Sequence, residues 1–354
     1  MIFAAIGHQD EWGKIADFVN KLREEQENPP LPVDKIQDVY AYFPPVKLFD
    51  VVMNSTTGHQ VEGMYIESFI SPDELDRAHL FQNISKVQQA CNKAAQLNTG
   101  VAALGGFTSI VIEAKHKAGL PAQNGTAYTS GNSLTAAFIA QGVQKACDKF
   151  GRSLADSTML IIGSTGDIGT ACVDYFKGTV KELLLVARKA GPLEAQESEL
   201  QQEGIACRAT TEIESILSEP DIVICVASSE LPAEYLALLP ETAIICDAGY
   251  PKNLSLKAAR PDQFIFAGGM GLVQAGYHFT PSHYHKMIYD FPLDHICHGC
   301  ILESVALAME NRSEAYSAGK GNITKEAMLE ILDMATKHGI VVAPFFNTNG
   351  LIKE

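Results

Sequence analysis

The stretch LIIGSTGDIGTACVDYF, residues 160–176, decides the fold of this chain. An apolar run leads into Gly163, Gly166 and Gly169, and a second apolar segment with helical periodicity follows. A pyrophosphate bound at the start of a helix needs glycines where the backbone turns and comes close, and helix amides then hold its charge. The stretch therefore predicts a strand, a turn and a helix that hold a dinucleotide on Gly163, Ser164, Thr165, Gly166, Asp167, Ile168 and Gly169. A purely structural turn is the alternative.

The surrounding sequence, from 157 to about 275, alternates short apolar strands with helices. The strands are TMLIIGS, ELLLVAR, DIVICVAS, TAIICDAG and QFIFAGG. Strands that are apolar on both faces indicate a parallel sheet covered on both sides. The class is α/β, with a doubly wound Rossmann-type domain.

The second of these strands indicates which dinucleotide binds. An NAD-binding domain carries an acid for the ribose 2′-hydroxyl about twenty residues after the glycines. This chain has Arg188 there, followed by Lys189, and a cation suits a 2′-phosphate. NADPH is therefore the predicted cofactor, although a solvated Arg188 at a strand end is the ordinary alternative.

Two later strand ends should complete the ligand cleft, because open α/β sheets bind ligands at the carboxyl ends of their strands. One is VASS at 226–229, with Ala227 and Ser228 as cofactor contacts. The other is DAGYPKN at 247–253, where an ordinary tight turn is equally compatible with the residues. Its side chains that could face the nicotinamide or the substrate are Asp247, Tyr250 and Lys252.

The remaining sequence suggests a division into three segments. Residues 1–132 read as a mixed α/β substrate domain, 133–279 as the Rossmann domain, and 280–354 as a C-terminal helical segment that folds back. The first segment should hold a strand at its start, a helix over 9–27, a hairpin around 55–58, a helix from Ser71, and a strand GVAALGGFTSIVIE broken at its Gly-Gly. A helix over 129–151, with a Ser/Asn cap and an end at Gly151, should connect the first two segments.

Composition excludes several classes of protein. The chain has 354 residues, 46% hydrophobic and 19% charged, with a net charge of −15. Such a charge argues against phosphate contacts with nucleic acid. There is no apolar run long enough to span a membrane and no secretory signal, so the expected location is the cytoplasm. The eight cysteines are scattered through apolar segments and should mostly be buried and reduced.

The last informative stretch is DHICHGCILESVALAMEN, residues 294–311, with two cysteines and two histidines close together. A zinc site is disfavoured, because one rigid helix cannot wrap four ligands tetrahedrally around an ion. A redox pair and two buried core cysteines stay open. So does a nucleophilic thiol near a helix start capped by Asp294, where the helix would lower the thiol pKa.

Several of these stretches resemble the long-chain acyl-(acyl carrier protein) reductases. The matching pieces are GMYIES (63–68), ALGGFTSI (103–110), SGN (130–132), GSTGDIGTA (163–171) and DAGYPKNL (247–254). The family's pattern of Cys, two residues and Glu before an apolar helix matches Cys300 and Glu303 better than Cys297. Ala248 stands where the pattern has glycine.

The resemblance implies that NADPH reduces a fatty acyl thioester, carried by acyl carrier protein or coenzyme A, to a free aldehyde. It implies Cys300 as the nucleophile that forms an acyl-enzyme, and an aldehyde-deformylating oxygenase as a downstream partner. His298 is a candidate acid or base, and equally an ordinary surface histidine. Tyr250 is a weaker catalytic candidate.

Backbone around Gly105, Gly106 and Phe107 would hold the acyl oxygen, or those glycines only bend a strand. Two rival functions also stay open on the sequence. One is an NADP-dependent dehydrogenase of the shikimate dehydrogenase type without covalent catalysis. The other is a non-catalytic NADP(H) or redox sensor.

Overall fold

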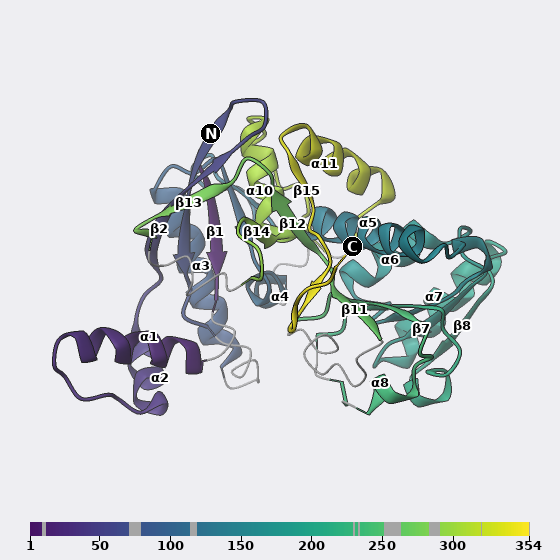
Figure 1. Ribbon diagram of the computed structural model, residues 1–354. Coiled ribbons are helices and arrows are strands. Elements are labelled where there is room, and N and C mark those ends of the chain that lie inside the picture. Colours follow the sequence, from purple (N-terminus) through teal and green to yellow (C-terminus); the bar gives the residue numbers. More distant parts are fainter. Residues whose placement is uncertain are drawn as a thin grey trace.

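The computed structural model describes residues 1–8, 12–70, 79–113, 119–228, 231–232, 234–250, 263–282, 291–319 and 321–353. It contains two six-stranded sheets, one on the left and one on the right of Figure 1. Helices α5 (Asn132–Phe150) and α10 (Gly299–Met309) pack against each other between them. Within the described residues, no helix is long and apolar enough to cross a membrane.

The second sheet is wholly parallel and has the strand order β11-β10-β9-β6-β7-β8. This is the order of doubly wound dinucleotide-binding domains, with its topological switch point between β6 and β9. The predicted fold class is confirmed. The strands are β6 (Thr158–Ile162), β7 (Glu182–Val186), β8 (Cys207–Thr210), β9 (Ile222–Cys225), β10 (Ile244–Asp247) and β11 (Phe264–Ala267).

Strand β8 is missing from the sequence-based prediction. It lies at the edge of the sheet, and its short Cys-Arg-Ala-Thr segment has only one buried residue. The other five strands are almost wholly buried because both faces of the sheet are covered. In β6, Met159 and Ile161 join the core that α5 and α6 (Asp167–Phe176) share, while Leu160 and Ile162 join the core on the opposite face.

The first sheet has the order β13-β2-β3-β1-β4-β5. Strands β3, β1, β4 and β5 run parallel, whereas β2 and β13 are antiparallel to their neighbours. The predicted hairpin is present as β2 and β3. The strands are β1 (Phe3–Gly7), β2 (Val46–Asn54), β3 (Gln60–Glu67), β4 (Val101–Leu104), β5 (Ala127–Thr129) and β13 (Tyr277–Thr280).

Strand β1 shows why this sheet is also covered on both sides. Phe3 and Ala5 pack into the core that contains α10, and Ala4 and Ile6 pack into the core under α3 (Leu80–Gln96). Successive residues of a strand point to opposite faces, so an uninterrupted apolar strand fits only between two layers. The carboxyl end of β1 consequently lies deep in the molecule, beside the start of α10.

Two expectations for the N-terminal part need correction. The Gly-Gly segment is not one broken strand: β4 ends at Leu104, and helix α4 (Phe107–Glu113) begins after the glycines. The N-cap of α5 is Gly131 in a left-handed conformation, not Ser or Asn, although the helix does end at Gly151. The expected helix from 9 to 27 is α1 (Trp12–Glu25), and Ser71 lies outside the described residues.

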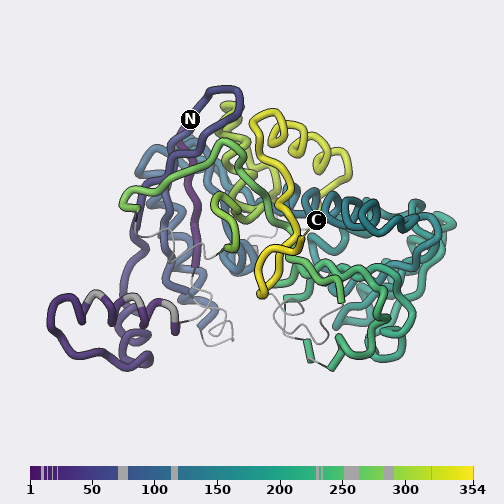
Figure 2. Tube along the Cα trace, in the orientation of Figure 1, coloured from purple at the N-terminus to yellow at the C-terminus, as the bar shows by residue number. Residues whose placement is uncertain are grey.

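A helical hairpin stands at the edge of the first half. Helix α1 and helix α2 (Val33–Tyr42) pack on each other through Trp12, Ile15, Ala16 and Ile36. Figure 2 shows them as a separate lobe at the lower left.

The C-terminal part is less helical than the sequence suggests. Besides α10 and α11 (Lys325–Lys337), it contributes β14 (Ile296–His298) and β15 (Ile340–Val342), which flank β12 (Met270–Val273) in a small antiparallel sheet. A final hairpin is formed by β16 (Phe346–Asn347) and β17 (Gly350–Leu351). Strand β13 joins the first sheet, so the chain returns to that sheet where the Rossmann strands end.

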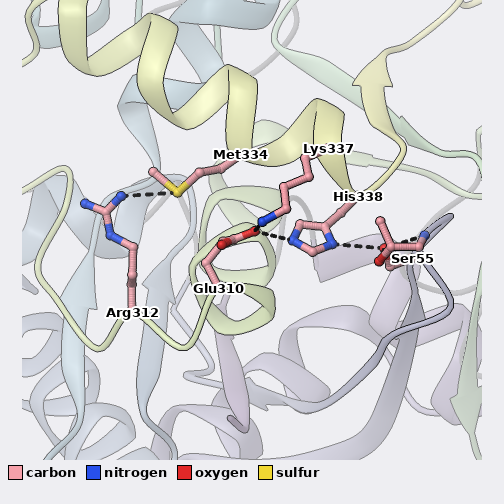
Figure 3. Close-up of polar contacts among 7 residues, drawn as sticks. Ser55, Glu310, Arg312, Met334, Lys337 and His338 are labelled. Carbon is pink, nitrogen blue, oxygen red and sulfur yellow. Dashed lines mark hydrogen bonds and ion pairs between the residues drawn. The ribbon is translucent and has the colours of Figure 1, made fainter.

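A buried polar relay ties the β2–β3 turn to the C-terminal helices (Figure 3). His338, at the end of α11, contacts Ser55 Oγ through Nδ1 at 2.9 Å and Glu310 Oε1 through Nε2 at 2.6 Å. Lys337 Nζ also contacts Glu310 Oε1, at 2.6 Å. The order Ser, His, Glu is that of a hydrolase triad, but Ser55 is 5% exposed and its Oγ also contacts the Thr57 hydroxyl. The relay therefore has a structural role: it holds the β2–β3 turn against the ends of α10 and α11.

Candidate functional site

The glycine-rich turn has the geometry that a bound pyrophosphate needs. Gly163 has a φ of +93°, and a Cβ there would lie 3.1 Å from the backbone of Val226 and Ala227. A Cβ on Gly169 would lie 2.1 Å from Gly163 O, so only glycine lets α6 approach the turn. Gly166 is the N-cap of α6, whose first amides face the turn.

The Ser164 hydroxyl provides a further test of this site. Ser164 is fully buried in the turn, and its Oγ has no hydrogen-bond partner within the described part of the chain. Buried hydroxyls normally have partners, so an orphan in a phosphate-binding turn fits a donor kept for a ligand. The residues present therefore fit a dinucleotide.

The predicted 2′-phosphate residues lie at the carboxyl end of β7. Arg188 and Lys189 are both exposed there, and Lys189 is the N-cap of α7 (Ala190–Gln202). Strand β7 is the neighbour of β6, the strand that carries the glycine-rich turn. Both cations thus occupy the edge where the ribose of a dinucleotide lies in this fold.

A cavity of about 450 Å³ joins the Rossmann turn to the first sheet and to α10. Of the predicted site residues, it is lined by Gly105, Gly106, Gly166, Asp167, Ile168, Gly169, Ala227, Ser228, Tyr250, His298 and Cys300. Gly163, Ser164, Thr165, Phe107, Arg188 and Lys189 lie outside its lining. The cavity is also lined by residues that were not predicted as site residues: His8 and Thr135, and Tyr65 and Asn132, which belong to the GMYIES and SGN pieces.

Cys300 lies in the first turn of α10, at the wall of this cavity. It is partly exposed, whereas the other seven cysteines are buried and all eight are free thiols. Gly131 lies against its backbone: a Cβ there would be 2.2 Å from Cys300 O.

The expected lowering of the Cys300 pKa is wrong. Burial raises the pKa of the thiol to about 11, and the nearby Glu303 carboxylate acts in the same direction. The Gly106 and Ile301 amides oppose this shift but do not outweigh it, because desolvation of a thiolate costs more than two amide contacts return. The protonated thiol is thus the favoured form of Cys300 near neutral pH.

Cys297 is not a second thiol on the same helix face. It lies in β14, paired with Gly271 of β12, and is fully buried. The chain changes from strand to helix between the two cysteines, and the N-cap of α10 is His298, not Asp294. His298 lines the cavity, with its ring 5.5 Å from that of Phe291.

The Gly-Gly segment comes closest to the thiol. The amide of Gly105 donates to Ile6 O at 3.0 Å, and a Cβ on Gly105 would lie 3.9 Å from Cys300 Sγ. Gly106 has a φ of +55°, and its backbone amide acts to lower the pKa of the Cys300 thiol.

Glu303 is a buried carboxylate one helical turn after Cys300. Thr129 donates its hydroxyl to Oε1 at 2.5 Å, and Oε2 accepts from Leu134 N at 3.0 Å and from Ser317 Oγ at 2.9 Å. Burial raises the Glu303 pKa, while these donors hold the charged form. The carboxylate thereby fixes β5 and the start of α5 against α10. Only the Cys-x-x-Glu spacing signals this residue in the sequence.

Asp167 and Asn132 link the glycine-rich turn to α5. Asn132 Nδ2 donates to Asp167 Oδ2, and the Gly321 amide donates to Oδ1, both at 2.8 Å. The SGN and GSTGDIGTA pieces, distant in sequence, are thus in contact. The Asp167 carboxylate, at the start of α6, thus accepts hydrogen bonds from both of these donors.

The 247–253 segment is only partly described. Asp247 is fully buried and its Oδ1 accepts from the Gly249 amide at 3.3 Å, which indicates a role within the turn. Tyr250 reaches the cavity, where its ring meets those of His8 and Phe107 at 5.3 and 5.0 Å. Lys252 lies outside the described residues.

Two solved structures show a limited similarity to this chain. The dipicolinate synthase A chain from Bacillus subtilis is 14% identical and covers 76% of this chain and 88% of its own, with a TM-score of 0.38. The nucleotide-binding domain of glutamyl-tRNA reductase from Thermoplasma volcanium is 17% identical and covers 39% of this chain and 86% of its own, with a TM-score of 0.26. No family model matches the chain.

A curated protein is similar over nearly the whole length. The long-chain acyl-[acyl-carrier-protein] reductase of Synechococcus elongatus is 28% identical over 357 residues, which cover 96% of this chain and 98% of that protein. The similarity confirms the resemblance that the motifs indicated. This chain is therefore an enzyme, and over nearly its whole length it is similar to a long-chain acyl-[acyl-carrier-protein] reductase.

Proposed function

We propose that this protein reduces a long-chain fatty acyl thioester, carried by acyl carrier protein or coenzyme A, to a fatty aldehyde with NADPH. The observation that carries the proposal is a shared cavity. The Cys300 thiol and the glycine-rich turn of the Rossmann domain line the same space, so a nucleophile and a hydride donor meet there. The similarity to an acyl-[acyl-carrier-protein] reductase supports the choice of substrate.

The residues that would hold NADPH come from three strand ends of the Rossmann sheet. The turn from Gly163 to Gly169 would take the pyrophosphate, and Arg188 with Lys189 the 2′-phosphate. Ala227 and Ser228, after β9, line the cavity at the switch point. When bound, NADPH supplies a hydride to the acyl carbon.

Cys300 divides the reaction into two steps. In the first, its sulfur bonds to the acyl carbon, the carrier C–S bond breaks, and the carrier thiol leaves with a proton. In the second, after reduction, the bond between Cys300 and the substrate carbon breaks and releases aldehyde and free thiol. Because burial raises the Cys300 pKa to about 11, the sulfur must pass its proton to a base as it attacks. His298 is the candidate for this transfer.

The expected substrate contacts lie beside the thiol. The missing side chain of Gly105 would leave room for an acyl group next to Cys300, whereas the space beside Gly106 is filled by His8, which accepts from the Phe107 amide. Apolar side chains such as Ile110, Met270 and Ile301 line the same cavity. The aldehyde product would be a substrate for an aldehyde-deformylating oxygenase, the partner that the resemblance implies.

Two cysteine variants test the proposal. The native protein, incubated with NADPH and a C16 or C18 acyl thioester on either carrier, should form aldehyde and show an acyl group on Cys300 by mass spectrometry. Cys300→Ala should lose both, by about a thousandfold or more, because the covalent route is gone. Cys297→Ala is the matched control and should keep activity, since that thiol is buried in β14.

Other outcomes identify the rival functions. Aldehyde formation by Cys300→Ala at the native rate would favour a dehydrogenase without covalent catalysis. An absence of aldehyde from the native protein with all substrates would refute the reductase. Loss of activity in Cys297→Ala alone would assign the chemistry to the other sulfur.

A further inference from the structure

We propose that Asp167 is a positioning residue: it fixes the glycine-rich turn, and with it the bound NADPH, in the position relative to Cys300 that hydride transfer requires. The inference rests on the proposed function and concerns its second step. Asp167 is the first residue of α6, and Asn132 is the first residue of α5. Both line the cavity together with Cys300.

The Asp167 carboxylate is hydrogen-bonded on both of its oxygens. Oδ2 accepts from Asn132 Nδ2, and Oδ1 accepts from the Gly321 amide, both at 2.8 Å. An ionised carboxylate can only accept hydrogen bonds, and the same holds for the oxygens of an ionised pyrophosphate. The side chain therefore cannot hold the pyrophosphate, although it stands at the helix start that would receive this group. Its contacts are made to other parts of the protein.

The contact with Asn132 leads directly to the helix that carries the thiol. Asn132 follows Gly131, and a Cβ on Gly131 would lie 2.2 Å from both Cα and O of Cys300. A Cβ on Gly299 would lie 2.9 Å from Thr135 Cα, which belongs to the same turn of α5. The first turn of α5 is therefore packed against the start of α10 and is hydrogen-bonded to the glycine-rich turn through Asn132.

The contact with Gly321 leads to the same helix by a second route. Gly321 lies shortly after Ser317, whose hydroxyl donates to Glu303 Oε2 at 2.9 Å. The Ser317 hydroxyl also accepts from the Ser133 amide at 2.9 Å, in the first turn of α5. Both donors to Asp167 therefore belong to segments of the chain that are attached to α10.

The attachment of α5 to α10 does not depend on Asp167. Leu134 N donates to Glu303 Oε2 at 3.0 Å, and the Thr129 hydroxyl donates to Oε1 at 2.5 Å. A substitution at Asp167 should thus leave Cys300 in place and release only the glycine-rich turn. Hydride transfer is sensitive to such a change, because a misplacement of about 1 Å can cost about 100-fold in rate. The two steps of the reaction should therefore respond differently.

Three variants test the contact between Asp167 and Asn132. Asp167→Ala removes it together with the contact to Gly321. Asn132→Asp replaces the donor by a second carboxylate, which repels Asp167, and it provides the same test should Asp167→Ala fail to fold. The double variant Asp167→Asn with Asn132→Asp is the matched control. It exchanges donor and acceptor at the native net charge, and the side-chain amide at position 167 can still accept from Gly321.

Single-turnover experiments on the acylated protein with saturating NADPH measure the second step. We expect hydride transfer to fall about 10-fold or more in Asp167→Ala and Asn132→Asp, and to return to within about threefold of native in the double variant. Acylation of Cys300 without NADPH, followed by mass spectrometry, should stay within about threefold of native in all three variants. The NADPH dissociation constant, measured by fluorescence, should change by less than about threefold, because the amides of the turn remain.

Three results would overturn the proposal. Parallel losses of acylation and hydride transfer would show that Asp167 only maintains the fold. A dissociation constant for NADPH raised about tenfold or more, with hydride transfer at saturation unchanged, would make Asp167 a binding residue instead. A double variant no faster than Asn132→Asp would show that the hydrogen bond between the two side chains does not position the turn.

Failure of the proposed function gives a different result from failure of this inference. If the proposed function were wrong, the native protein would form neither an acyl group on Cys300 nor an aldehyde. If only the role of Asp167 were wrong, both reactions of the native protein would proceed.

Discussion

At the scale of single residues, side chains of the same type lie in different environments at this site. Cys297 and Cys300 are three positions apart, yet one is sealed between strands and the other opens to the cavity. His8 and His298 approach that cavity from different elements, β1 and the start of α10. What each group can do follows from these neighbours rather than from its residue type.

The prediction at the scale of single residues concerns the preference for NADPH over NADH and tests Arg188. Arg188→Asp should raise the KM for NADPH about 10- to 100-fold and change that for NADH little, because a charge-assisted contact with the 2′-phosphate is replaced by repulsion. Steady-state rates with both cofactors measure this, and Lys189→Asp shows whether the neighbouring cation shares the role. Equal losses with NADPH and NADH would argue against a 2′-phosphate contact.

At the scale of elements, the start of α10 organises the site. Strand β14 leads into this helix at His298, Cys300 occupies its first turn, and Glu303 joins it to β5 and α5. The glycine before α5, Gly131 with a φ of +73°, allows the two helix starts to touch. Cys300, the proposed nucleophile, is thus positioned by a helix-to-helix contact and not by a loop.

Glu303→Gln tests this arrangement. The substitution removes a negative charge that raises the Cys300 pKa, so the pH dependence of Cys300 alkylation should shift to lower pH. It also places an amide NH2 or a neutral oxygen opposite the Leu134 and Ser317 donors, which should cost about 1 to 3 kcal/mol of unfolding free energy. An alkylation profile unchanged in a folded variant would show that Glu303 has no electrostatic effect on the thiol.

At the scale of the whole molecule, the two halves are held together by more than the shared core. The relay in Figure 3 joins the β2–β3 turn of the first sheet to the ends of α10 and α11. Asp167 joins Asn132 and Gly321 to the Rossmann turn. The cavity lies between these attachments, so its shape depends on the relative position of both sheets.

The relay predicts a pH dependence of stability. Lys337 and His338 lower the Glu310 pKa in the folded protein. The carboxylate therefore stabilises the fold above its unfolded pKa of about 4.3, and this contribution is lost as pH falls through the lower folded pKa. Urea unfolding should show native protein more stable than Glu310→Gln by on the order of 1 kcal/mol at pH 7. The difference should shrink below about pH 4, and a constant difference would contradict the assignment.

Much of the fold could be predicted from the sequence, because its signals are local. The turn glycines, the apolar strands and the cation after β7 each act within a few residues, so the Rossmann domain and its predicted cofactor follow from spacing alone. The edge strand β8 and the helix after Gly106 were missed. A short half-exposed strand has little periodicity, and apolar residues after two glycines fit a strand or a helix.

The sequence by itself thus determined the doubly wound sheet, the resemblance to the acyl-[acyl-carrier-protein] reductases and Cys300 as the predicted nucleophile. Only the tertiary structure decided the neighbours of that thiol. His8, Gly106, Gly131 and Glu303 come from four separate parts of the chain and meet at one helix end. The raised pKa of Cys300 is likewise a product of burial between two sheets. Hydrogen bonding and desolvation depend on distances in space, which the order of residues along the chain does not contain.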